Sequence, residues 1–183
     1  MDVSADFQAT NNQLAITISN HVSDLLSVGQ AVRSVSFELS TGENVGWLQS
    51  SSATLRTVNK NGTFSDQLAQ ITAWNLNLTG EGFQLLFPAP DQTIIGEAGD
   101  NGRYNYANGS VAGNKPHNAF LLSGATFYVT IPGVDANTQV KNVVFGLGTG
   151  SDTDGGILQP VPEPASLGLL GLGAVALLRR RRK

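Results

Sequence analysis

Two histidines are the side chains of this chain best suited to acid–base chemistry at neutral pH. His21 and His117 lie in stretches without strand periodicity, and serine and aspartate are plentiful, so a Ser-His-Asp hydrolase is chemically conceivable. The sequence has no Gly-x-Ser-x-Gly motif, however, and serine near a lone histidine is expected by chance. We therefore predict a protein without enzymatic activity and keep a hydrolase that depends on His117 as an alternative.

The acidic residues make a weaker case for a metal site. Asp152 and Asp154 have a spacing that occurs in calcium loops, but the further ligands and the closing glutamate of an EF-hand are missing. A solvated acidic linker is the better interpretation of this segment. The sequence leaves open whether Asp91, Asp100 and Asn101 share a calcium site in the fold. The chain has no cysteine, and we predict no metal ligands and no cofactor.

Aromatic side chains suggest carbohydrate binding, because ring faces suit the stacking of sugars. Trp47 and Trp74 are two candidates, but Trp74 alternates in phase with two leucines, so we expect it in the core. Tyr104 and Tyr106, in the stretch RYNYANG, are better placed for an exposed loop face. We predict these two tyrosines as the glycan contacts of an alternative function, that of an extracellular carbohydrate-binding module.

The elements that would position such sites are strands. Charged residues make up only 14% of the chain, and glycine accounts for 21 of 183 residues, above its usual share of about 7%. A polar, uncharged and glycine-rich chain of this kind suits an extracellular β protein better than a helical cytosolic enzyme.

Apolar and polar residues alternate in about seven or eight short segments, each of which predicts a strand with one wet face. The clear segments are residues 13–19, 33–39, 72–78, 82–87, 125–131 and 141–147, and the weaker ones are 53–58 and 93–95. Asn61-Gly62 indicates a hairpin, because a type I′ turn needs positive φ at both central residues. Residues 21–32 favour one short helical turn or a connector. The pattern predicts an all-β fold, an antiparallel β-sandwich over residues 1–147.

The composition changes after this body. Residues 148–161 are rich in Gly, Ser, Asp and Pro and predict a flexible linker. Residues 165–178 form an apolar run of 14 residues, which as a helix would span about 21 Å of a bilayer core of about 30 Å. Arginine side chains can snorkel and extend this reach. We predict a single C-terminal apolar helix that spans the membrane.

A basic block follows the apolar run and fixes its orientation. It consists of Arg179, Arg180, Arg181, Arg182 and Lys183. Lysine and arginine next to a membrane span stay in the cytoplasm, so the body would lie outside. Residues 1–160 carry six basic against thirteen acidic side chains, a net charge of −7, and we predict no nucleic-acid partner.

Three parts of the tail together resemble a PEP-CTERM sorting signal at residues 162–183: Pro162-Glu163-Pro164, the apolar run and the basic block. The resemblance implies an exported Gram-negative protein, a transient stay in the inner membrane and processing by exosortase, a membrane cysteine protease-transpeptidase. It also implies a secretory signal peptide, but residues 1–10 have neither its basic nor its apolar region. We expect that this peptide was removed or lies upstream of the assigned start.

The leading prediction is therefore an exported, non-enzymatic protein of the cell surface or extracellular matrix. Exopolysaccharide is its candidate partner beside exosortase. The alternatives are the extracellular carbohydrate-binding module and an envelope hydrolase.

Overall fold

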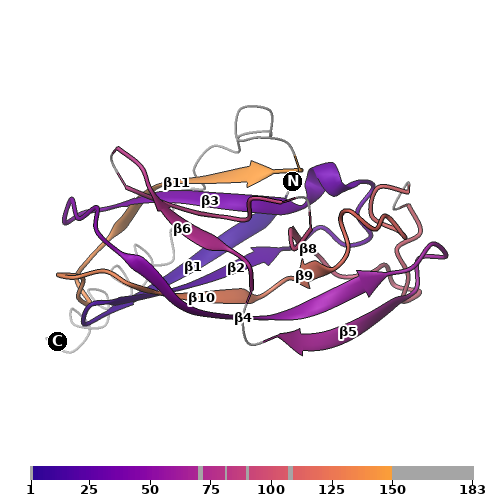
Figure 1. Cartoon of the computed structure of the whole chain (residues 1–183), viewed down its shortest axis with the longest axis horizontal. Helices are drawn as coiled ribbons and strands as arrows, with labels where there is room; N and C mark the ends of the chain where they lie inside the picture. Colours follow the sequence, from indigo (N-terminus) through magenta and orange to yellow (C-terminus); the bar gives the residue numbers. More distant parts are fainter. Residues whose placement is uncertain (1, 70–71, 81, 90, 107–108, 150–183) are drawn as a thin grey trace, which may run out of the picture.

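The computed structural model describes residues 2–69, 72–80, 82–89, 91–106 and 109–149 (Figure 1). Within these ranges the chain forms eleven strands and one 3-10 turn, η1 (Val28–Gln30). The strands are β1 (Val3–Thr10), β2 (Gln13–Asn20), β3 (Val32–Leu39), β4 (Trp47–Val58), β5 (Phe64–Ala69), β6 (Asn75–Leu78), β7 (Phe83–Leu86), β8 (Ile94–Ile95), β9 (Phe120–Leu122), β10 (Ala125–Thr130) and β11 (Val140–Leu147). The predicted all-β class is confirmed, and of the two alternatives for residues 21–32 the structure has a short turn, η1, within a connector.

The strands join into one large mixed sheet in the order β1-β2-β10-β4-β9-β8-β3-β7-β6, with β5 paired to β4 and β11 paired to β3. β4 connects two regions, because its first half pairs with β10 and its second half with β5 and β9. Two expectations are wrong: the strands outnumber the predicted seven or eight, and β8 and β9 pair in parallel. The predicted segments leave out three strands: β1, β5, whose side chains are mostly exposed, and β9, which is only three residues long. They also leave out the first half of β4.

The main core lies between two parts of this sheet. Alternate residues of β2 and β10 are buried, as their period-two pattern predicted. The Phe7 ring on β1 packs on the Phe37 ring of β3 with 5.3 Å between centroids, and Phe37 packs on Phe83 of β7 at 5.5 Å. Figure 1 shows β3 and β11 on one side of the body and β1, β2 and β10 on the other. Removal of these apolar side chains from water stabilises the arrangement.

The predicted hairpin at Asn61-Gly62 joins β4 to β5, but its turn is not of type I′. The amide of Gly62 donates to the carbonyl of Asn59 at 2.9 Å, and the amide of Asn59 donates to Thr63 at 2.8 Å. Only Gly62 has positive φ, at 79°, so the loop has three residues with glycine at the left-handed position.

The predicted tail lies outside the residues that the structure describes. This concerns Pro162-Glu163-Pro164, the apolar run 165–178 and the basic block, as well as most of the linker. In the described ranges, no helix is long and apolar enough to cross a membrane. The domain boundaries at 147 and 161 stay predictions; β11 ends at Leu147.

Candidate functional site

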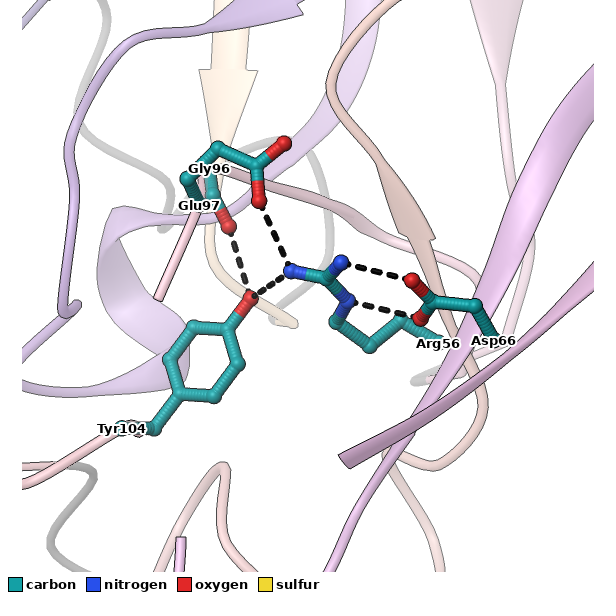
Figure 2. A network of polar contacts seen from close by, with 5 residues as sticks. All are labelled: Arg56, Asp66, Gly96, Glu97 and Tyr104. Carbon is teal, nitrogen blue, oxygen red and sulfur yellow. Dashed lines mark hydrogen bonds and ion pairs between the residues drawn. The ribbon is translucent and has the colours of Figure 1, made fainter. Parts of the chain in front are cut away.

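The most extensive cluster of charged side chains in the described structure surrounds Arg56, on the second half of β4 (Figure 2). Arg56 is only 4% exposed. Its Nε and one terminal nitrogen donate to both carboxylate oxygens of Asp66 on β5, at 2.8 and 2.7 Å. The strand register places the two residues directly opposite each other. Two parallel charge-assisted hydrogen bonds of this kind are stronger and more specific in geometry than a single one.

The other terminal nitrogen of Arg56 holds the long loop that begins at Gly96. It donates to Glu97 at 2.9 Å and to the hydroxyl of Tyr104 at 3.1 Å. The Tyr104 hydroxyl in turn donates to the carbonyl of Gly96 at 2.8 Å. The guanidinium also lies 3.8 Å above the centre of the Phe64 ring, a cation–π contact. Arg56 therefore fastens the loop onto the β4–β5 hairpin.

The electrostatics of this cluster favour a fixed charge state. Burial would lower the pKa of Arg56, but the hydrogen bonds to Asp66, Tyr104 and Glu97 outweigh it and raise that pKa. The hydrogen bond from Arg56 lowers the pKa of Asp66. Burial raises the pKa of Tyr104 above its usual value, although Arg56 opposes this shift. At neutral pH Arg56 is charged, Asp66 ionised and Tyr104 neutral, so the cluster acts as a structural clamp.

We expect acid to weaken this clamp. Because the folded pKa of Asp66 is lowered, its contribution to stability is fully present above the unfolded value of about 3.9 and is lost as the pH falls through the lower folded value. Asp66→Asn should therefore be less stable than the wild type at pH 7, and the difference should shrink towards pH 2. Urea unfolding of both proteins across this range measures it, and a difference that stays constant with pH would contradict the assignment.

The structure corrects one predicted glycan contact. Tyr104 is only 2% exposed, since its ring packs against Phe64 and its hydroxyl is enclosed by Arg56 and Gly96. The expectation that it lies on an exposed loop face is wrong, and its ring face is not available to a sugar. Tyr106, two residues on, is 64% exposed as expected.

The two tryptophans also differ in their exposure to solvent. Trp74 is buried, as predicted, and its ring lies 5.0 Å from that of Phe127. Trp47, at the start of β4, is 53% exposed.

The histidines lie in different connectors, as expected. His21 is exposed, and its Nε2 forms a hydrogen bond of 2.9 Å with the Ser4 hydroxyl. In the described part of the chain, no carboxylate hydrogen-bonds to the ring of His21. His117 donates from Nδ1 to the carbonyl of Ser110 at 2.6 Å, which ties down its own loop.

The possible metal ligands do not gather. Among the described residues, no three His, Cys, Asp or Glu side chains lie close enough to hold a metal ion, and Asp91 and Asp100 belong to no such group. Asn101 hydrogen-bonds to Asn105 within its own loop at 2.8 Å. Asp152 and Asp154 fall outside the described residues.

A second candidate region is the sheet surface of β1, β2, β10 and the first half of β4 that points away from the core. The register aligns its side chains in rows across all four strands. The central row comprises Gln8, Ala15, Tyr128 and Ser50. The flanking rows comprise Thr10, Gln13, Thr130 and Trp47, and Asp6, Thr17, Thr126 and Ser52. We call these rows, with Gln49 at the β4 bulge, the outer face; none of its residues is buried.

Sequence reasoning missed the Arg56 cluster and the outer face, although part of each signal was present. Tyr128 was recognisable as a wet-face residue of its strand, and Arg56 as a cation within the predicted strand 53–58. Several of their partners come from segments distant in sequence: β10 lies beside both β2 and β4, and Glu97 and Tyr104 reach Arg56 from the loop after β8. Only the sheet order and register bring these residues together.

The comparisons with known proteins concern the tail. Residues 160–183 match the family model described as the PEP-CTERM protein-sorting motif, which confirms the resemblance of Pro162-Glu163-Pro164, the apolar run and the basic block. No curated protein and no solved structure matches the chain. The motif supports an exported protein, anchored by its tail and processed by exosortase. The chain is therefore a protein that carries the PEP-CTERM protein-sorting motif.

Proposed function

We propose that the chain is a non-enzymatic protein of the cell surface or extracellular matrix of a Gram-negative bacterium. The match of residues 160–183 to the sorting motif carries this proposal, because the motif supports export and processing by exosortase. The apolar run 165–178 would hold the protein in the inner membrane, and Arg179 to Lys183 would keep the end of the tail in the cytoplasm. Processing would then free the body for the surface or the matrix.

The body supports a role outside the cell. It is all-β, and its exposed strand positions carry mainly hydroxyl and amide groups rather than charges. We also propose that it is a β-sandwich, since ring contacts such as Phe7 with Phe37 join strands of opposite parts of the sheet. We propose no catalytic role for His21 or His117.

The test is the intact mass of the protein from the envelope and the medium of its native host. We expect a mass that ends near residues 161–164, with or without an added group. A variant with Pro162, Glu163 and Pro164 all replaced by alanine should keep a mass that ends at Lys183 and stay in the membrane fraction. Tyr106→Ala, a substitution in the exposed body loop, serves as the control and should be processed like the wild type.

Two results would contradict the proposed function. One is a wild-type protein that ends at Lys183 in every fraction. The other is a triple-alanine variant processed as efficiently as the wild type.

A further inference from the structure

We propose that the outer face of β1, β2, β10 and β4 binds a neutral polysaccharide, with Tyr128 and Trp47 as the residues that stack on its sugar rings. This inference rests on the proposed function, because export brings the body into contact with polysaccharides outside the cell. It assigns a different site from Tyr104 and Tyr106, which the sequence favoured.

The charge of the outer face selects a neutral ligand. Asp6, in a flanking row, is its only charged residue, and its other polar side chains are hydroxyls and amides. Without a cation, the face has nothing to neutralise the carboxylates or sulfates of an acidic polymer. A neutral polysaccharide instead offers hydroxyl groups that both donate and accept, which matches serine, threonine and glutamine side chains.

Several of these polar groups are already held in place. Gln49 accepts hydrogen bonds from Gln13 on β2 at 3.1 Å and from Thr130 on β10 at 3.2 Å, so one amide oxygen spans three strands. The hydroxyls of Thr17 and Thr126 lie 3.1 Å apart across β2 and β10. Side chains fixed in this way lose less conformational entropy when a ligand binds.

The aromatic residues provide the apolar part of the site. Tyr128 is 38% exposed in the central row, and Trp47 is 53% exposed in the adjacent row on the neighbouring strand. One strand across and two residues along correspond to about 8 Å between the two backbone positions. Two ring faces at this separation can contact successive parts of an extended sugar chain, because aromatic rings combine a large contact area with a polar edge.

Other macromolecules fit this surface less well. A protein partner of the usual kind would meet a face whose only aliphatic side chain is Ala15, whereas the centre of a protein interface is largely apolar. Nucleic acid would meet a body whose residues 1–160 carry a net charge of −7. The combination of hydroxyls, amides and two exposed rings favours a polyhydroxylated ligand.

Affinity electrophoresis of the full chain tests the proposal. The gels would contain hydroxyethyl cellulose, dextran or galactomannan as neutral probes and alginate as the acidic probe. A detergent without a sugar headgroup keeps the tail soluble and avoids competition for the face. The variants are Tyr128→Ala, Trp47→Ala and Tyr128→Phe, and Tyr106→Ala is the matched control because its ring is exposed outside the outer face. Circular dichroism and thermal unfolding establish that each variant is folded.

We expect at least one neutral probe to retard the wild type, and each of Tyr128→Ala and Trp47→Ala to weaken binding about tenfold. Tyr128→Phe, which keeps the ring, and Tyr106→Ala should bind as the wild type does. The proposal is overturned if no neutral probe retards the chain, if only alginate does, or if Tyr106→Ala alone abolishes binding. Because the intact-mass experiment reports on export independently, either hypothesis can fail while the other stands.

Discussion

Phe127→Ala should lower the free energy of unfolding by about 3–5 kcal/mol, the usual cost of truncating a buried phenylalanine. Phe127 is fully buried on β10 and contacts the Trp74 ring at 5.0 Å between centroids. The strand register sets it between Ile16 on β2 and Ser51 on β4, so the cavity would open in the middle of the main core. β10 is hydrogen-bonded to β2 on one side and to β4 on the other, so the surrounding backbone can close such a cavity only in part.

Tyr128→Ala is the matched control for this substitution. It removes the ring of the next residue on the same strand, but from the outer face, and should change the free energy of unfolding by about 0.5 kcal/mol or less. Urea unfolding followed by tryptophan fluorescence measures both variants. If both variants lost the same free energy of unfolding, β10 would not have one buried and one solvated face. A stable Tyr128→Ala is also what the polysaccharide test requires.

The sequence predicted the elements of this core well, because burial on one face leaves a local signature. Leu14, Ile16 and Ile18 alternate with polar residues, and all three are buried on β2. The period-two rule needs no knowledge of the partner strand. It fails where a strand has no buried face, as in β5, or is too short to show a period, as in β9.

The candidate sites depend on long-range pairing and were harder to predict. Tyr104 follows a glycine- and asparagine-rich stretch that resembles a solvated loop. Its hydroxyl is buried next to Arg56, 48 positions away, whose guanidinium donates a hydrogen bond to it. Hydroxyl groups can be buried at little cost when such a partner exists, and nothing local in the sequence announces it.

The outer face, too, could be predicted only in part from the sequence. Alternation placed Tyr128 on a wet face, but not beside Trp47, because the order of β10 and β4 in the sheet is not encoded in either strand's pattern. The bulge in β4 also shifts the register between Tyr128 and Val129, which a regular alternation does not predict.

The sorting motif, in contrast, could be predicted from the sequence alone. Its order of proline–glutamate–proline, apolar run and basic block lies within one short segment and needs no pairing with distant residues.

Asp66→Ala should be the most destabilising change in the charged cluster, at about 2–3 kcal/mol. Arg56, whose side chain is 5% exposed in the wild type, would lose two hydrogen bonds, of 2.8 and 2.7 Å. An arginine cannot relieve this cost by losing its proton. The loss is below the roughly 3–5 kcal/mol of a fully buried pair, because the Asp66 side chain is 36% exposed. Glu97→Ala should cost about 1 kcal/mol or less, since that carboxylate is 65% exposed.

A double substitution tests whether the fold needs the charge of Arg56 itself, or needs Asp66 only because Arg56 is a buried cation. When Arg56→Met is combined with Asp66→Ala, no buried cation remains, and an apolar side chain of similar length fills the space next to Phe64 and Tyr104. We expect this double variant to recover much of the stability lost in Asp66→Ala, because apolar replacements of buried ion pairs are often neutral. Urea unfolding of the single and double variants measures the coupling. A double variant that is less stable than Asp66→Ala would contradict this expectation. It would mean that the hydrogen bonds of Arg56 to Glu97 and Tyr104 stabilise the loop even without Asp66.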